Sequence, residues 1–122
     1  MDPPIALIVD DETDFRTLLG EVLREEGYVV VDAADGAHAL QILDCLIPDV
    51  MILDLLMPVM DGWELYAVVE RRSELASVPV VFLSAVSQQA PESGSLIVKK
   101  PLDLRGLTAL LKAIHPDGSM TS

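Results

Sequence analysis

Short runs of apolar residues recur along this chain, and most are followed by a stretch whose apolar residues fall at helical spacing. A strand made almost wholly of apolar residues is typical of a parallel sheet, because helices cover both faces of such a sheet. We therefore predict an α/β fold built on a five-stranded parallel sheet. The strands are expected at 5–9, 28–31, 50–53, 80–83 and 96–98.

The stretches between these strands predict amphipathic helices. They are expected over 13–26, from 35 to 47, over 63–72 and from 103 to 114. The first helix has an apolar stripe that should face the sheet, made of Phe15, Leu18, Leu19, Val22 and Leu23. We expect Gly27 to end this helix and Asp35 to cap the second one.

The composition narrows the class of protein. The 122 residues carry a net charge of −12, which repels nucleic acid and anionic lipid, so we expect no direct nucleic-acid partner and no membrane. Cys45 is the single cysteine, so we expect no internal disulfide and a cytoplasmic location. We see no secretory signal, and no apolar run approaches the roughly 20 residues that cross a bilayer. One domain is expected over 1–115, followed by a disordered tail over 116–122.

Charged and polar residues stand where the predicted strands end. They are Asp10, Asp11 and Glu12 after the first strand, Asp54 after the third, Ser84 after the fourth, and Lys99 and Lys100 after the fifth. The carboxyl ends of parallel strands lie at one edge of a sheet, where such folds bind ligands. Several carboxylates at this edge would repel one another unless a cation joined them, and oxygen ligands favour Mg²⁺. The serine and a lysine could hold the oxygens of a phosphoryl group on Asp54.

Four segments resemble the receiver domains of two-component response regulators, and the resemblance covers nearly the whole chain. They are VDDE at 9–12, LDLLMPVMDG at 53–62, LSA at 83–85 and KKP at 99–101. The resemblance implies the flavodoxin-like, doubly wound strand order 2-1-3-4-5. It also implies a phosphoprotein that accepts a phosphoryl group from a sensor histidine kinase or a phosphotransfer protein. Its output would pass through a downstream protein partner or an attached output domain.

The same resemblance implies a role for each residue of the site. Asp54 would be the phosphoacceptor, in a Mg²⁺-dependent reaction. Direct ligands of the Mg²⁺ would be Asp11, Asp54 and the backbone carbonyl of Leu56, while Asp10 would act through a water molecule. The groups that contact the phosphoryl oxygens would be Ser84, the backbone of Ala85, and Lys100. On this interpretation the chain catalyses its own phosphorylation and dephosphorylation and is not an enzyme that turns over small molecules.

The chain departs from the family pattern in two respects, and a further feature concerns the lifetime of the phosphorylated state. Ile97 stands where family members carry an aromatic switch residue, so an aliphatic repacking or no switch is expected. Only about eleven residues, 85–95, separate the fourth and fifth strands, which predicts a shortened or missing fourth helix. In the family, the positions of Leu56 and Val86 flank the path of the hydrolytic water. Apolar side chains cannot orient that water by hydrogen bonding, so we expect slow self-dephosphorylation.

Other interpretations of the same residues stay open. Asp10 and Asp11 could cap the first helix, and Ser84 could be an ordinary turn residue. The alternative function is a constitutive pseudo-receiver, whose fold is kept for docking to other proteins. A phosphatase with an aspartyl-phosphate intermediate fits poorly, because that chemistry needs a second carboxylate two residues after the nucleophile, where Leu56 stands.

Overall fold

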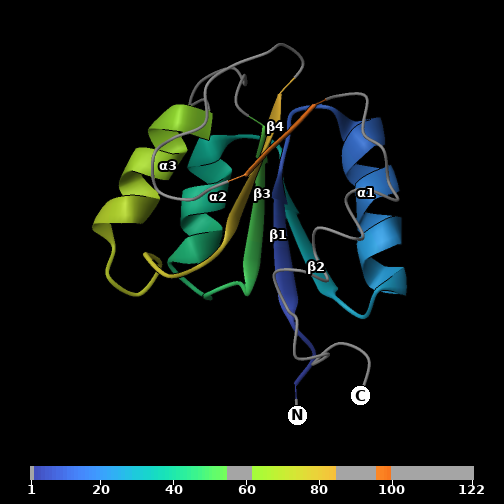
Figure 1. The fold of residues 1–122 in the computed structure, drawn as a ribbon, viewed down its shortest axis with the longest axis horizontal. Helices are drawn as coiled ribbons and strands as arrows, with labels where there is room; N and C mark the ends of the chain where they lie inside the picture. Colours follow the sequence, from blue (N-terminus) through green and yellow to red (C-terminus); the bar gives the residue numbers. More distant parts are fainter. Residues whose placement is uncertain (1, 55–61, 85–95, 100–122) are drawn as a thin grey trace.

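The computed structural model describes residues 2–54, 62–84 and 96–99, in which strands and helices alternate (Figure 1). The strands are β1 (Ile5–Val9), β2 (Val29–Ala33), β3 (Val50–Asp54), β4 (Val80–Ser84) and β5 (Leu96–Lys99). The helices are α1 (Thr13–Glu25), α2 (Gly36–Leu43) and α3 (Gly62–Arg71). Neighbouring strands all pair in parallel, in the order β2-β1-β3-β4-β5. The predicted fold class and strand order are therefore confirmed.

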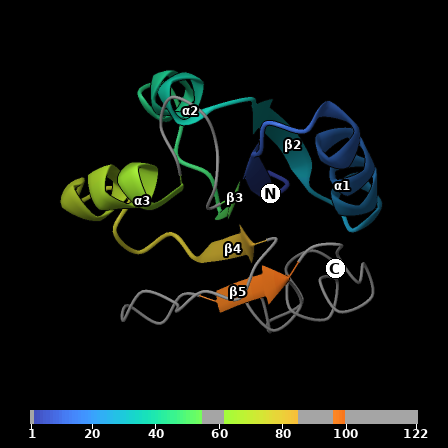
Figure 2. The ribbon, with the colours of Figure 1, turned by 90° about the horizontal axis from the view of Figure 1, so that it is seen from above.

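The described helices lie on both faces of the sheet. Figure 2 shows α2 and α3 on one side and α1 on the other. Alternate residues of the central strands feed two separate apolar clusters. The cluster under α2 and α3 includes Leu7, Val9, Met51, Leu53, Val80 and Phe82. The cluster under α1 includes Ala6, Ile8, Val50, Ile52, Val81 and Leu83. Burial on both faces explains why these strands read as continuous apolar runs.

Two helix boundaries follow from single residues. Gly27 has a φ of 98°, a left-handed conformation that favours glycine. Its N–H donates to the carbonyl of Arg24 (3.0 Å), and the N–H of Tyr28 donates to that of Leu23 (3.0 Å), which closes the C-terminus of α1. At the start of α2, Asp35 Oδ1 accepts from the backbone N–H of His38 (2.8 Å). Both sequence-based predictions are confirmed.

The structure corrects several details of the predicted elements, and α2 ends at Leu43 and not at residue 47. β2 begins at Val29 and not at residue 28, because the backbone N–H of Tyr28 is used to close α1. The apolar stripe of α1 is narrower than predicted, since Leu18 is 47% exposed while Leu19 and Leu23 are fully buried. The expected helix from 103 to 114, the tail over 116–122 and the segment 85–95 lie outside the described residues.

Tyr28 lies at the amino end of β2, at the opposite end of that strand from the candidate site. Its side chain is 4% exposed. Burial, with smaller contributions from the negative charges of Asp49 and Glu26, raises the pKa of the Tyr28 phenol to about 12. Within the described part of the chain, no helix has the length and apolar character needed to cross a membrane.

Candidate functional site

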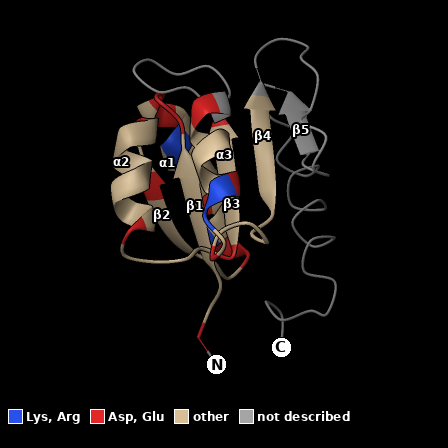
Figure 3. Ribbon diagram, turned by 90° about the vertical axis from the view of Figure 1, so that its left-hand side faces the viewer, with Lys and Arg blue, Asp and Glu red and all other residues tan. Residues whose placement is uncertain are grey.

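The candidate site lies at the carboxyl ends of β1, β3 and β4. The register pairs Val9 of β1 with Leu53 of β3, so the next residues, Asp10 and Asp54, are also neighbours. Adjacent strands are about 5 Å apart, so the backbones of these two residues lie close together. Figure 3 shows acidic positions at this end of the ribbon, toward which β4 points. The sheet therefore brings together two residues that are separated by most of the first half of the chain.

Burial distinguishes Asp10 and Asp54 from the other charged residues. Asp10 is fully buried and Asp54 is 5% exposed, and they are the buried charged residues among those the structure describes. The four residues before each of them, which end in Val9 and Leu53, are fully buried and apolar. A carboxylate in such surroundings costs free energy unless hydrogen bonds, opposite charge or a cation compensate it. Two adjacent buried carboxylates are therefore typical of a functional site.

Hydrogen bonds hold Asp10 on three sides. Its backbone N–H donates to the carbonyl of Ala33 (3.1 Å), which extends the pairing of β1 with β2 by one residue. Its Oδ1 accepts from the backbone N–H of Glu12 (2.8 Å), and its own carbonyl accepts from a guanidinium nitrogen of Arg16 (2.6 Å). The turn from β1 into α1 is thus built around Asp10.

Asp11 and Glu12 continue the acidic group on the exposed side. Carboxylate oxygens of Asp10, Asp11 and Glu12 all lie within 4.8 Å of one another, and the last two residues are exposed to solvent. Exposed carboxylates alone do not make a metal site. Here they adjoin the buried Asp10, which follows the strand that pairs with β3, and all the donors are oxygens. This donor set fits a hard divalent cation such as Mg²⁺, with positions left for water.

The structure does not support the alternative that Asp10 caps the first helix. Glu12 occupies the N-cap position of α1, and its side chain makes no capping hydrogen bond there. The side chain of Asp10 accepts from the N–H of Glu12 itself, which precedes the first helical residue, Thr13. Asp10 therefore shapes the turn before the helix, and its carboxylate stays at the edge of the sheet.

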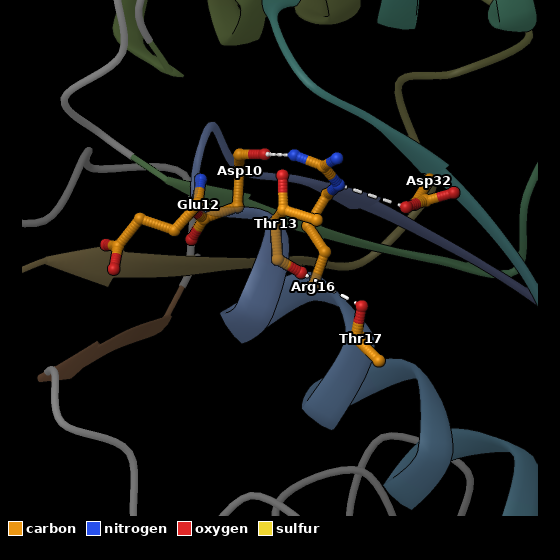
Figure 4. A network of polar contacts seen from close by, with 6 residues as sticks. All are labelled: Asp10, Glu12, Thr13, Arg16, Thr17 and Asp32. Carbon is orange, nitrogen blue, oxygen red and sulfur yellow. Dashed lines mark hydrogen bonds and ion pairs between the residues drawn. The ribbon is translucent and has the colours of Figure 1, made fainter.

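Sequence reasoning missed the contribution of Arg16 and Asp32. The Nε atom of Arg16 donates to Asp32 Oδ2 (3.0 Å), while another nitrogen of the same guanidinium donates to the carbonyl of Asp10 (Figure 4). Asp32 lies on β2 and Arg16 on α1, sixteen residues apart. Spacing within one element cannot reveal such a contact. The available signal was a basic residue one turn into a helix that follows an acidic strand end.

Several predicted site residues are only partly described. Ser84 ends β4, and the register pairs it with Lys99 of β5. These strands thus place their carboxyl ends at the same edge as Asp54, which pairs with Leu83. Ile97 of β5, the edge strand, pairs in register with Phe82 of β4. The roles of four other residues stay predictions, because these residues lie outside the described part of the chain: Leu56, Ala85, Val86 and Lys100.

Comparison with known proteins points to one family. The family model described as response regulator receiver domain matches residues 6–112. The probable transcriptional regulator ycf27 of Guillardia theta is 37% identical over 114 residues, covering 88% of this chain and 44% of that protein. The chain therefore spans less than half the length of this curated relative.

Solved structures agree with the sequence match. The chemotaxis response regulator CheY4 of Vibrio cholerae superposes with a TM-score of 0.83 at 30% identity, covering 93% of this chain and 99% of that one. The signal receiver domain of a signal transduction histidine kinase from Syntrophus aciditrophicus superposes with a TM-score of 0.84 at 28% identity, covering 98% and 95%. The likeness therefore extends over nearly the whole fold.

Proposed function

The chain belongs to the response regulator receiver domain family, and on that premise we propose that Asp54 is its phosphoacceptor. The observation that carries the proposal is the burial of Asp54 at the end of β3, next to the buried Asp10. A buried carboxylate at a sheet edge, on the strand beside the one that leads to Asp10, is suited to a metal-assisted group transfer. An exposed aspartate that merely ends a strand would need none of these neighbours.

The proposed reaction is a phosphoryl transfer from a phosphohistidine. An oxygen of the Asp54 carboxylate attacks the phosphorus, and the new O–P bond forms as the P–N bond breaks. The electron pair of the broken bond stays on the imidazole nitrogen of the donor, which takes up a proton. The product is an aspartyl phosphate. Hydrolysis later returns Asp54 and inorganic phosphate.

The carboxylates at the edge of the sheet would hold Mg²⁺ for this reaction. Asp11 and Asp54 would bind it directly, with the backbone carbonyl of Leu56, and Asp10 would bind it through water. Bound Mg²⁺ neutralises charge on the carboxylates and on the phosphoryl oxygens. Ser84, the backbone of Ala85, and Lys100 would orient those oxygens. The support for this set is the oxygen-only donor chemistry around Asp10 and the convergence of the strand ends.

The proposed partners follow from this chemistry. A sensor histidine kinase or a phosphotransfer protein would donate the phosphoryl group, and a downstream protein or an attached output domain would receive the signal. In this account the chain catalyses its own phosphorylation and dephosphorylation. A constitutive docking module would have no use for two adjacent carboxylates buried among apolar residues, which cost free energy whenever they are charged.

Intact-mass spectrometry of the purified chain tests the proposal. The protein is incubated with Mg²⁺ and acetyl phosphate, a small phosphoryl donor. We expect one added phosphoryl group on the wild type, and none on Asp54→Asn or in the absence of Mg²⁺. Asp49→Asn is the matched control, because Asp49 lies at the opposite end of β3 and should leave the modification intact.

One result would overturn the proposal. If neither acetyl phosphate nor a panel of phosphorylated histidine kinases modified a folded wild-type protein, the chain would be a docking module and not a phosphoacceptor. Circular dichroism of each variant shows whether a missing modification reflects chemistry or unfolding.

A further inference from the structure

The guanidinium of Arg16 connects the first strand, the first helix and the second strand at one point. One of its nitrogens donates to the backbone carbonyl of Asp10 (2.6 Å), and its Nε donates to the carboxylate of Asp32 (3.0 Å) (Figure 4). The side chain of Arg16 is 14% exposed, whereas that of Asp32 is 53% exposed. Asp32 therefore holds the guanidinium from the solvent side, and Arg16 in turn holds the end of β1.

The carbonyl that Arg16 contacts belongs to the peptide bond between Asp10 and Asp11. The other groups of Asp10 are also held, its N–H by Ala33 and its carboxylate by the N–H of Glu12. The contact with Arg16 therefore fixes the plane of the peptide from which Asp11 begins. Asp11 is exposed, so packing does not confine its side chain. The orientation of this peptide therefore limits the directions in which its carboxylate can point.

Arg16 leaves the carboxylates available. It bonds to a backbone carbonyl in the acidic turn and to the carboxylate of Asp32, which stands on another strand. The oxygens of Asp10, Asp11 and Glu12 that lie within 4.8 Å of one another are not used in either bond. An arginine that simply neutralised this cluster would be expected to pair with one of its carboxylates.

We propose that Arg16, held by Asp32, is a positioning residue for the metal site, which orients Asp11 toward the bound cation. The inference rests on the proposed function, since it assumes that Asp11 binds Mg²⁺. A positioning role and a purely electrostatic role of Arg16 predict opposite changes in the affinity for Mg²⁺ when the side chain is removed. Removing a positive charge near a cation site should strengthen Mg²⁺ binding by Coulomb's law. Removing a positioning residue should weaken it.

Isothermal titration calorimetry with Mg²⁺ on the unphosphorylated full chain separates these effects. In Arg16→Ala we expect the Kd for Mg²⁺ to rise about tenfold, the scale seen when groups that orient metal ligands are lost. In Arg16→Lys the charge is kept, but one ammonium cannot reproduce the planar bridge between the two acceptors. Its Kd should therefore also rise, by a smaller factor. Arg24→Ala is the matched control, since Arg24 is exposed on the same helix two turns further on.

The outcomes distinguish the two proposals. An unchanged or lower Kd in Arg16→Ala, beside a wild type that binds Mg²⁺, would overturn the positioning role and leave the proposed function intact. A wild type that does not bind Mg²⁺ would overturn both. Unfolding by urea, measured without Mg²⁺, reports any loss of stability separately. If Arg16→Ala does not fold, Arg16→Lys decides, because a Kd equal to that of the wild type would refute the bridge.

Discussion

Replacement of Asp11 by asparagine should have opposite effects on stability without and with Mg²⁺. In the metal-free protein, the carboxylate of Asp11 lies within 4.8 Å of those of Asp10 and Glu12. Two unit charges at this separation repel by about 1 kcal/mol in a water-like medium, so the two pairs cost about 2 kcal/mol. The N-terminus of α1 favours negative charge and offsets up to about 1 kcal/mol of this cost. Because the three residues are consecutive, much of this repulsion persists in the unfolded chain, so Asp11→Asn should raise the free energy of unfolding by less than about 1 kcal/mol at low salt.

With Mg²⁺ the order should reverse. A ligand that binds only the folded state adds about 2.7 kcal/mol when its concentration is a hundred times its Kd. The wild type should receive this gain in full. Asp11→Asn lacks a charged ligand, so its Kd is higher and its gain at the same Mg²⁺ concentration is smaller. The wild type should then be the more stable of the two proteins.

Urea unfolding followed by far-ultraviolet circular dichroism measures both effects, with a chelator present or with Mg²⁺ in excess. The matched control is Asp14→Asn, in the first turn of α1 but outside the acidic cluster, which should keep the full Mg²⁺ gain. High salt should shrink the metal-free difference. The reasoning is refuted if Asp11→Asn is less stable without Mg²⁺, or if it gains as much from Mg²⁺ as the wild type.

Three further predictions follow from individual residues. Because burial raises the pKa of Tyr28 from 10.0 to about 12, the folded state holds this proton more tightly than the unfolded chain. The contribution of this group to the free energy of unfolding should be complete below about pH 10 and should fall by about 2–3 kcal/mol as the pH rises through 12. Urea titrations should show this fall in the wild type and not in Tyr28→Phe. Asp35→Ala should cost about 1 kcal/mol, because the cap to His38 is lost. Asp44→Ala removes an exposed ion pair and should cost about 0.5 kcal/mol or less, so equal losses in the two variants would contradict this ranking. Leu56→Asn should shorten the lifetime of the phosphorylated protein, measured by mass spectrometry after removal of the donor, and an unchanged lifetime would refute the role given to Leu56.

Features that depend on neighbouring residues could be predicted from the sequence. The apolar run 50–53 specifies a buried strand, and Gly27 and Asp35 specify helix boundaries, because the responsible contacts are local. The position of Asp54 at a strand end followed from the same pattern. Parallel pairing of the strands places Asp10 and Asp54 at one edge of the sheet. The outline of the site could therefore be predicted from the sequence.

Features that depend on packing between distant elements could not be predicted in the same way. Tyr66 of α3 is 7% exposed and packs edge-on against Phe82 of β4, with ring centroids 5.1 Å apart. The ion pair between Arg16 of α1 and Asp32 forms because β2 places Asp32 beside that helix. Neither contact has a signature in local spacing, because each depends on how a helix docks on the sheet.

The central claim is that Asp54, and not another carboxylate of the cluster, receives the phosphoryl group. Borohydride reduces an aspartyl phosphate to homoserine, so treatment of the phosphorylated protein followed by tandem mass spectrometry of its peptides locates the modified residue. The account predicts homoserine at position 54 alone. Homoserine at position 10 or 11 would contradict it, because those carboxylates are assigned to Mg²⁺ binding and not to attack on phosphorus.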